Sequence, residues 1–149
     1  ETGRRVADAL CRAAARGVRV RLLLGAAWYV EAENRAVAGR LNDWAARTGN
    51  PLSVRLARPG GRYGAVHAKG VVVDDAAVVG SLNWNRHSAR ENREVALALS
   101  GAEPAAYYRR AFAADWRASE SGPRPGLVAA AGVAALVGLA ALRRVEFDG

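Results

Sequence analysis

Residues 67–94 read HAKGVVVDDAAVVGSLNWNRHSARENRE. Apolar residues dominate 65–73 and again 77–81, and the acidic pair Asp74-Asp75 lies between these two runs. Because aspartate is typical of tight turns and valine is common in strands, this pattern predicts a β-hairpin. A polar stretch, 83–93, follows the hairpin. The hairpin is therefore the centre from which the rest of the fold is inferred.

Polar side chains gather at the open end of this predicted hairpin. His67 and Lys69 are two residues apart, so their side chains are expected on one face of the first strand. Ser81 and Asn83 repeat that spacing just after the returning strand, and Gly80 allows the backbone to approach closely beside them. The hairpin is thus expected to bring an imidazole, an ammonium, a hydroxyl and an amide to one place.

This set of side chains suits a phosphodiester. Lys69, Ser81 and Asn83 can donate hydrogen bonds to the charged phosphate oxygens, and donors placed in advance lower the barrier without a metal. The imidazole of His67 can attack phosphorus or protonate the departing alkoxide. Glu94 is expected to accept a hydrogen bond from the other ring nitrogen of His67 and to fix its tautomer.

The lysine at position 69 is exceptional in this sequence. The chain has 22 basic residues, and Lys69 is its only lysine, while methionine, isoleucine and glutamine are absent. Under such a bias, a position that needs only a positive charge is expected to carry arginine. A compact ammonium, unlike a guanidinium, presents its donors without planar bulk. Lys69 is therefore expected to have a specific role.

The rest of the chain alternates between helical and extended patterns. Apolar side chains at three- and four-residue spacing predict helices, and strict alternation predicts strands. This alternation favours an α/β layered domain, with the aromatic side chains near its end in the core. The expected helices lie at 4–16, 31–48 and 104–118, the strands at 18–24, 52–56 and 95–99, a loop at 59–64, and the core aromatics are Tyr108, Phe112 and Trp116.

The central segment resembles the H-x-K-x4-D motif of the phospholipase D superfamily, followed by its G-S-x-N element. The resemblance extends over roughly residues 3–117, with one residue fewer than usual in the turn between the two motifs. That difference predicts a tighter turn. The matching residues are His67, Lys69 and Asp74 in the first motif, Gly80, Ser81 and Asn83 in the second, and Glu94 at the position of the acidic residue that orients the histidine.

The resemblance implies a layered α-β-α sandwich, present here as a partial domain, and a reaction that needs no metal or cofactor. In this family two motifs meet, one histidine forms a phosphohistidine, and the other serves as acid and then as base. His87 is not followed by lysine at position 89, so it does not start a second motif and is expected at the surface. The second motif is expected from a missing N-terminal part of a longer chain, or from a homodimer partner. His67 would then be the acid/base.

The composition changes after the expected catalytic domain, 1–118. Residues 119–126 (SESGPRPG) are typical of a linker, and 127–142 is an uncharged run closed by Arg143-Arg144 in the tail 143–149. The length of this run is close to the lower limit of a bilayer span, so a transmembrane helix is expected and a buried terminal helix is the alternative. Since arginines tend to remain cytoplasmic, the catalytic domain is expected outside the cytoplasm.

Charge and composition narrow the partners without choosing one. The net charge is +8 and the isoelectric point is about 10.9, which suggests anionic partners such as phospholipids or nucleic acid. One cysteine, Cys11, excludes an internal disulfide and is expected to be a small buried side chain; with two histidines it cannot supply a four-ligand zinc site. We expect a membrane-anchored enzyme acting on phospholipid phosphodiesters, with a nuclease or a non-catalytic binding module as alternatives.

Overall fold

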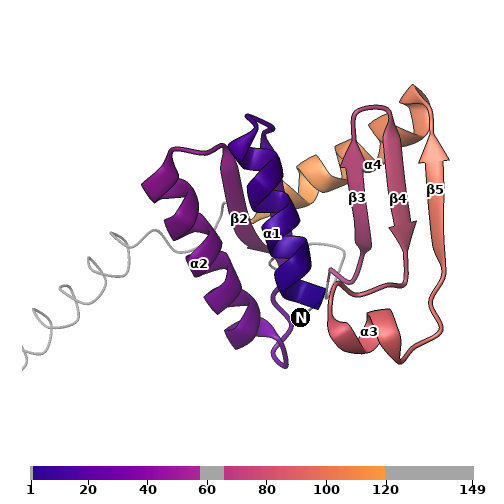
Figure 1. Ribbon diagram of the computed structural model, residues 1–149. Coiled ribbons are helices and arrows are strands. Elements are labelled where there is room, and N and C mark those ends of the chain that lie inside the picture. The colour runs from indigo at the N-terminus through magenta and orange to yellow at the C-terminus, as the bar shows by residue number, and fades with distance from the viewer. Residues whose placement is uncertain (1, 58–65, 120–149) are drawn as a thin grey trace, which may run out of the picture. The chain divides into compact units, whose positions relative to one another are not determined.

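Helices and strands are interspersed along the chain, which forms a mixed α/β domain (Figure 1). The structure is a computed structural model, and it describes residues 2–57 and 66–119. The elements are α1 (Thr2–Ala15), β1 (Val20–Gly25), α2 (Glu31–Thr48), β2 (Leu52–Ala57), β3 (Lys69–Val73), β4 (Ala76–Gly80), α3 (Arg86–Arg90), β5 (Ala96–Ser100) and α4 (Ala102–Ala118).

The first half of the domain is a βαβ unit. β1 and β2 are parallel, with Val20 opposite Leu52 and Gly25 opposite Ala57. The connecting helix α2 ends at Gly49, whose φ of 68° lies in the left-handed region that glycine adopts without a steric cost. The strands run in one direction, so their carboxyl ends lie at the same edge.

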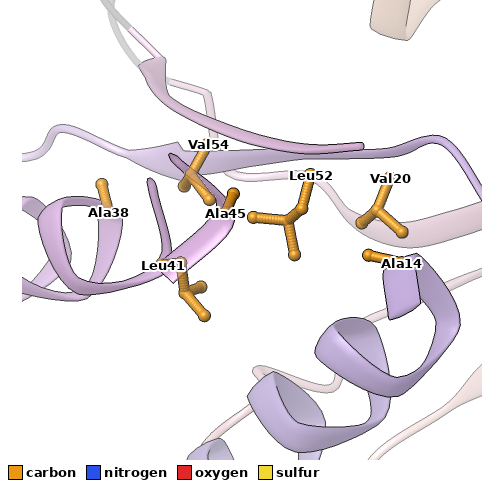
Figure 2. Packing of buried hydrophobic residues seen from close by; sticks show 7 residues of the cluster. All are labelled: Ala14, Val20, Ala38, Leu41, Ala45, Leu52 and Val54. Carbon is orange, nitrogen blue, oxygen red and sulfur yellow. The ribbon is translucent and has the colours of Figure 1, made fainter. Parts of the chain in front are cut away.

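Small and branched apolar side chains fill the space between this pair of strands and helices α1 and α2. Figure 2 shows α2 placing one face against β2 and α1 placing Ala14 beside Val20. Burial of these side chains from water is the main stabilising contribution to this half of the domain. The cluster consists of Ala14, Val20, Ala38, Leu41, Ala45, Leu52 and Val54.

A side chain of α2 also covers the outer edge of β2. The Asn42 amide nitrogen donates to the carbonyl of Val54 at 3.0 Å, and its oxygen accepts from the Val54 N–H at 2.8 Å. Both backbone groups of Val54 are thereby satisfied away from β1. This contact fixes the position of α2 along β2. It also covers part of a strand edge that would otherwise be open to pairing with another strand.

The second half is an antiparallel sheet in the order β3-β4-β5. Val72, Ala77 and Leu99 form one row across it, and Ala77, at 1% exposure, lies on the face that α4 covers (Figure 1). The neighbouring row contains Val71 and Val78, which are exposed. The strands therefore bury one face and leave the other open in the described residues.

Most of the predicted elements are confirmed. The α/β class is correct, and α2 has the predicted bounds. The first strand starts two residues later than expected, and the hairpin strand starts at Lys69, so His67 precedes the strand. Helix α3, within the polar stretch, was not predicted.

Two predictions lie outside the described residues: the loop at 59–64 and the transmembrane helix at 127–142 with its linker and tail. Within 2–57 and 66–119, no helix has the length and apolar character needed to cross a bilayer.

Candidate active site

The strand order brings the predicted site residues to one edge of the β3-β4-β5 sheet. Lys69, the first residue of β3, is opposite Gly80, the last of β4, which in turn is opposite Ala96 at the start of β5. We call this the active-site edge, and it consists of residues 66–69, 80–84 and 94–96. A side-chain carbon built on Gly25 would lie 3.7 Å from the Val66 carbonyl, so the carboxyl end of β1 reaches the same edge.

Lys69 is held by the residue two positions before it. Its Nζ donates a hydrogen bond to the His67 carbonyl at 2.8 Å, which leaves the other N–H groups of the ammonium for further acceptors. A shallow apolar pocket lies beside it, with Val71, Val78 and Trp84 in its lining. Partial burial lowers the pKa of Lys69, and the negative charge of Glu94 partly offsets that shift.

His67 is exposed and lies just before β3. Its backbone carbonyl accepts the hydrogen bond from the Lys69 ammonium. The sequence predicts a hydrogen bond between the His67 ring and Glu94. The hydrogen bonds of the Glu94 carboxylate are made with Ser81, Ser88 and Asn92, so the pairing with His67 stays a prediction.

Glu94 is bound on both of its oxygens. Oε2 accepts from the Ser81 hydroxyl at 2.5 Å, and Oε1 accepts from the Ser88 hydroxyl and from the Asn92 amide at 3.1 Å. The hydrogen bonds from Ser81, Ser88 and Asn92 lower the pKa of Glu94, and the charge of Lys69 acts in the same direction. The side chain is therefore a fixed carboxylate within the site.

Ser81 is used differently from the prediction. Its hydroxyl donates to Glu94 and accepts from the Val95 N–H at 3.1 Å. Donation from Ser81 to a phosphate oxygen therefore requires its proton to leave Glu94. In this arrangement Ser81 orients the Glu94 carboxylate, and Lys69 supplies the positive charge at the active-site edge.

Two residues that the sequence analysis did not select complete the site. Ser88, buried at 2% exposure, accepts from the Asn83 backbone N–H at 2.9 Å while it donates to Glu94. Asn85 caps α3 by accepting from the Ser88 N–H at 2.8 Å. The spacing of Asn85 and Ser88 is that of a helix start, which is the sequence signal that could have revealed them.

Gly80 is required by the close approach of β5. A side-chain carbon at this position would lie 2.2 Å from the Val95 carbonyl oxygen and 2.8 Å from the Ala96 Cα, both of which are backbone atoms. The predicted close approach is therefore present. It brings Ser81 within reach of Glu94 on the neighbouring chain segment.

Asp74 lies in the hairpin turn, at the far end of β3 from Lys69. Its φ is 48°, a left-handed conformation that aspartate tolerates better than most residues. Its carbonyl accepts from Arg109 on α4 at 2.5 Å. Five residue steps along the strand separate it from Lys69 by roughly 16 Å, so it supports the turn and does not reach the site.

The remaining predicted candidates are surface or packing residues. The side chain of His87 is 69% exposed, with its Nδ1 2.9 Å from Glu91, which confirms the surface position. Cys11 is half-buried against the core, and burial raises the pKa of its thiol. Within 2–57 and 66–119, no cluster of three acidic, histidine or cysteine side chains is suited to hold a metal ion.

Comparison with known proteins identifies the family. The family described as "Cardiolipin synthase, PLD-like domain" matches residues 2–116, so the chain belongs to the phospholipase D-like superfamily. NucT from Helicobacter pylori has a similar fold, with a TM-score of 0.62 and 24% identity over 78% of this chain and 73% of that one. No curated protein matches the chain. The resemblance inferred from the motif is thus confirmed.

Proposed function

We propose that the chain is part of a metal-independent phosphodiesterase that cleaves or transfers phospholipid headgroups. The observation that carries this proposal is the gathering of Lys69, Ser81, Asn83 and Glu94 at the end where His67 enters the sheet. A lysine, hydrogen-bond donors and a carboxylate around one histidine suit a phosphodiester. The family to which the chain belongs supports phosphodiester chemistry.

Lys69 and Asn83 bind the phosphate in this proposal. The Lys69 ammonium stabilises the negative charge that grows on the phosphate oxygens in the transition state, and the Asn83 amide donates beside it. The shallow pocket next to Lys69 is lined mainly by apolar residues, among them Val71, Val78 and Trp84. Removal of one such donor costs about a hundredfold to a thousandfold in turnover.

His67 acts as the acid and then as the base. A histidine of a second motif forms a bond to phosphorus while the bond from phosphorus to the leaving alcohol breaks. His67, as imidazolium, gives its proton to the departing oxygen. As neutral imidazole it then takes a proton from water or an alcohol that attacks phosphorus, which breaks the phosphohistidine bond and frees the second histidine.

The second motif comes from outside the described residues. The sequence contains one H-x-K motif, so the proposal needs either a further part of the same polypeptide or a second copy of this chain. Because one histidine must be the nucleophile while the other supplies the proton, neither motif alone completes the cycle.

Phospholipid is the preferred substrate class because of the apolar run at 127–142. In this proposal the run anchors the protein in a bilayer, and Arg143-Arg144 keep the tail cytoplasmic, so that the catalytic domain lies outside the cytoplasm. Such an anchor holds the site where phospholipids are concentrated. The net charge of +8 agrees with an anionic lipid surface and equally with a nucleic acid.

Product analysis by mass spectrometry tests the substrate class. The protein supplied with its second motif is incubated in EDTA with mixed phospholipid vesicles and single-stranded DNA, beside His67→Ala and Lys69→Ala variants. Headgroup release or exchange that disappears in both variants is the expected result. Cleaved DNA with intact lipid would replace the proposal with a nuclease, and no product from either substrate would favour a binding module.

A further inference from the structure

Two exposed aromatic side chains lie on the loop that follows β1. Trp28 is 88% exposed and Tyr29 is 63% exposed, and their rings meet edge to face at 5.6 Å with an interplanar angle of 86°. Large aromatic side chains are rarely left in water without a partner, because their burial is strongly favourable. The pair makes no contribution to the core cluster.

The loop that carries this pair is closed by hydrogen bonds on both sides. The Ala27 carbonyl accepts from the N–H groups of Val30 and Glu31, each at 2.9 Å. The Asn34 side chain of α2 donates to the Gly25 carbonyl at 2.8 Å, which fixes the point where β1 ends. The aromatic pair is thus presented by an ordered turn.

The pair lies near the active-site edge. Gly25 approaches the Val66 carbonyl, Trp28 is three residues beyond Gly25, and His67 is one residue beyond Val66. With about 3.8 Å between consecutive Cα atoms, the Cα atoms of Trp28 and His67 can be no more than roughly 23 Å apart. That separation is on the scale of a lipid molecule at a bilayer surface.

We propose that Trp28 and Tyr29 insert into the headgroup layer of a phospholipid bilayer and hold the active-site edge against it. This inference rests on the lipid substrate proposed above. Tryptophan and tyrosine favour the interface between water and hydrocarbon, because each ring is apolar and carries one polar group. The turn places both rings where a bilayer that supplies substrate to His67 would lie.

A nucleic acid strand fits the same surface less well. Successive bases stack on ring faces, whereas this pair is perpendicular, so one ring presents its edge to the other. Glu31 and Glu33 follow immediately in the first turn of α2. Glu31 is paired with Arg35 at 2.5 Å, and the carboxylate of Glu33 would repel a polyphosphate backbone.

Fluorescence quenching tests the insertion independently of catalysis. The full chain is mixed with phosphatidylcholine vesicles that contain lipids brominated on their acyl chains, and the Trp28→Phe variant is measured in parallel so that the difference reports Trp28 alone. Trp28 is expected to be open to aqueous acrylamide without vesicles, and to be quenched by the brominated lipids and protected from acrylamide with them. The proposal is overturned if acrylamide still quenches Trp28 when vesicles are present. It is also overturned if Trp28 is already shielded from acrylamide before the vesicles are added.

Turnover separates this inference from the proposed function. Trp28→Ala with Tyr29→Ala is expected to slow turnover of vesicle lipid about tenfold and to leave turnover of a monomeric short-chain phospholipid unchanged. Equal losses of turnover on both substrates would contradict an interfacial role. A double variant that loses binding to single-stranded DNA and keeps binding to vesicles would contradict it as well. If the wild-type protein supplied with its second motif turns over neither lipid, the proposed function fails and the quenching result still decides the insertion.

Tyr107→Ala is the matched control. Tyr107 is 61% exposed and meets Tyr108 edge to face, as Trp28 meets Tyr29, but it lies near the start of α4, which follows the end of β5 remote from the active-site edge. Its replacement is expected to change neither the quenching of Trp28 nor turnover of vesicle lipid. A loss as large as that of the Trp28 and Tyr29 variant would show that any exposed aromatic has this effect.

Discussion

The Ser81 hydroxyl and the Glu94 carboxylate are joined by a hydrogen bond of 2.5 Å, from the end of one strand to the segment that leads into the next. This contact is reinforced by the Ser88 hydroxyl on the other oxygen of the same carboxylate. Glu94 is thereby the residue on which the β4–α3 segment and the start of β5 converge. The order of the active-site edge therefore depends on the charge of one carboxylate.

The dependence on that charge predicts a loss of stability in acid. Because hydrogen bonds lower the pKa of Glu94 in the folded protein, its stabilising contribution is complete above the ordinary glutamate value of about 4.3 and is lost as the pH falls through the lower, folded-state pKa. Denaturant unfolding at several pH values is expected to show this loss in the wild type and a smaller one in Glu94→Gln. Identical acid dependence in the two proteins would mean that Glu94 is not the titrating group.

Ser88→Ala tests the buried hydroxyl. The substitution leaves the Asn83 N–H without its acceptor and removes one of the two donors to Glu94 Oε1, so we expect a loss of about 1–3 kcal/mol in the free energy of unfolding. Ser100→Ala, at an exposed serine at the end of β5, is the control and is expected to change it by less than about 0.5 kcal/mol. Equal effects in chemical denaturation would show that Ser88 has no special role.

Gly80→Ala tests the close approach of β4 and β5. Since the new carbon would meet backbone atoms of Val95 and Ala96, the strands must separate, and we expect destabilisation of about 1–3 kcal/mol together with reduced activity. Gly39→Ala is the control, because nothing lies within 4 Å of that position in α2; the helix is expected to gain about 0.5–1 kcal/mol. Thermal unfolding that ranks the two variants in the opposite order would refute the packing described here.

Asp74 offers a test of structural against chemical roles within the family motif. Asp74→Gly is expected to leave turnover within about twofold, because glycine adopts the left-handed backbone and the side chain does not reach the site. Asp74→Val is expected to destabilise the protein by about 1–2 kcal/mol, because a β-branched side chain is strained at this φ. A large loss of activity in a stably folded Asp74→Gly protein would assign the carboxylate to the chemistry.

The sequence was sufficient for the features that depend on local pattern. Helix α2 was predicted at about 31–48 from its apolar spacing and from Asn50-Pro51 beyond its end, and these bounds are the observed ones. The hairpin followed from two apolar runs on either side of Asp74-Asp75, and the close approach at Gly80 followed from its place beside Ser81. These predictions needed no knowledge of how distant segments pack.

The rest depends largely on contacts between segments that are separate in the sequence. Helix α3 has five residues and is held by the Asn85 cap and by Ser88 contacting Glu94, which lies beyond the helix. The exposure of Trp28 could not be foreseen, because the same residue type at Trp116 is buried. The engagement of Ser81 by Glu94 likewise appears only when the two segments are brought together.

The most direct test of the account is turnover in EDTA by the protein supplied with its second motif, with His67→Ala and His87→Ala compared. His87 is an exposed histidine bonded to Glu91 and lies outside the active-site edge. His87→Ala therefore makes the same chemical change as His67→Ala at a position away from the site. We predict full activity of the wild type in EDTA, a loss of about a hundredfold or more in His67→Ala, and a change of less than about twofold in His87→Ala. Activity that EDTA abolishes, or a His67→Ala protein as active as the His87→Ala control, would contradict the account.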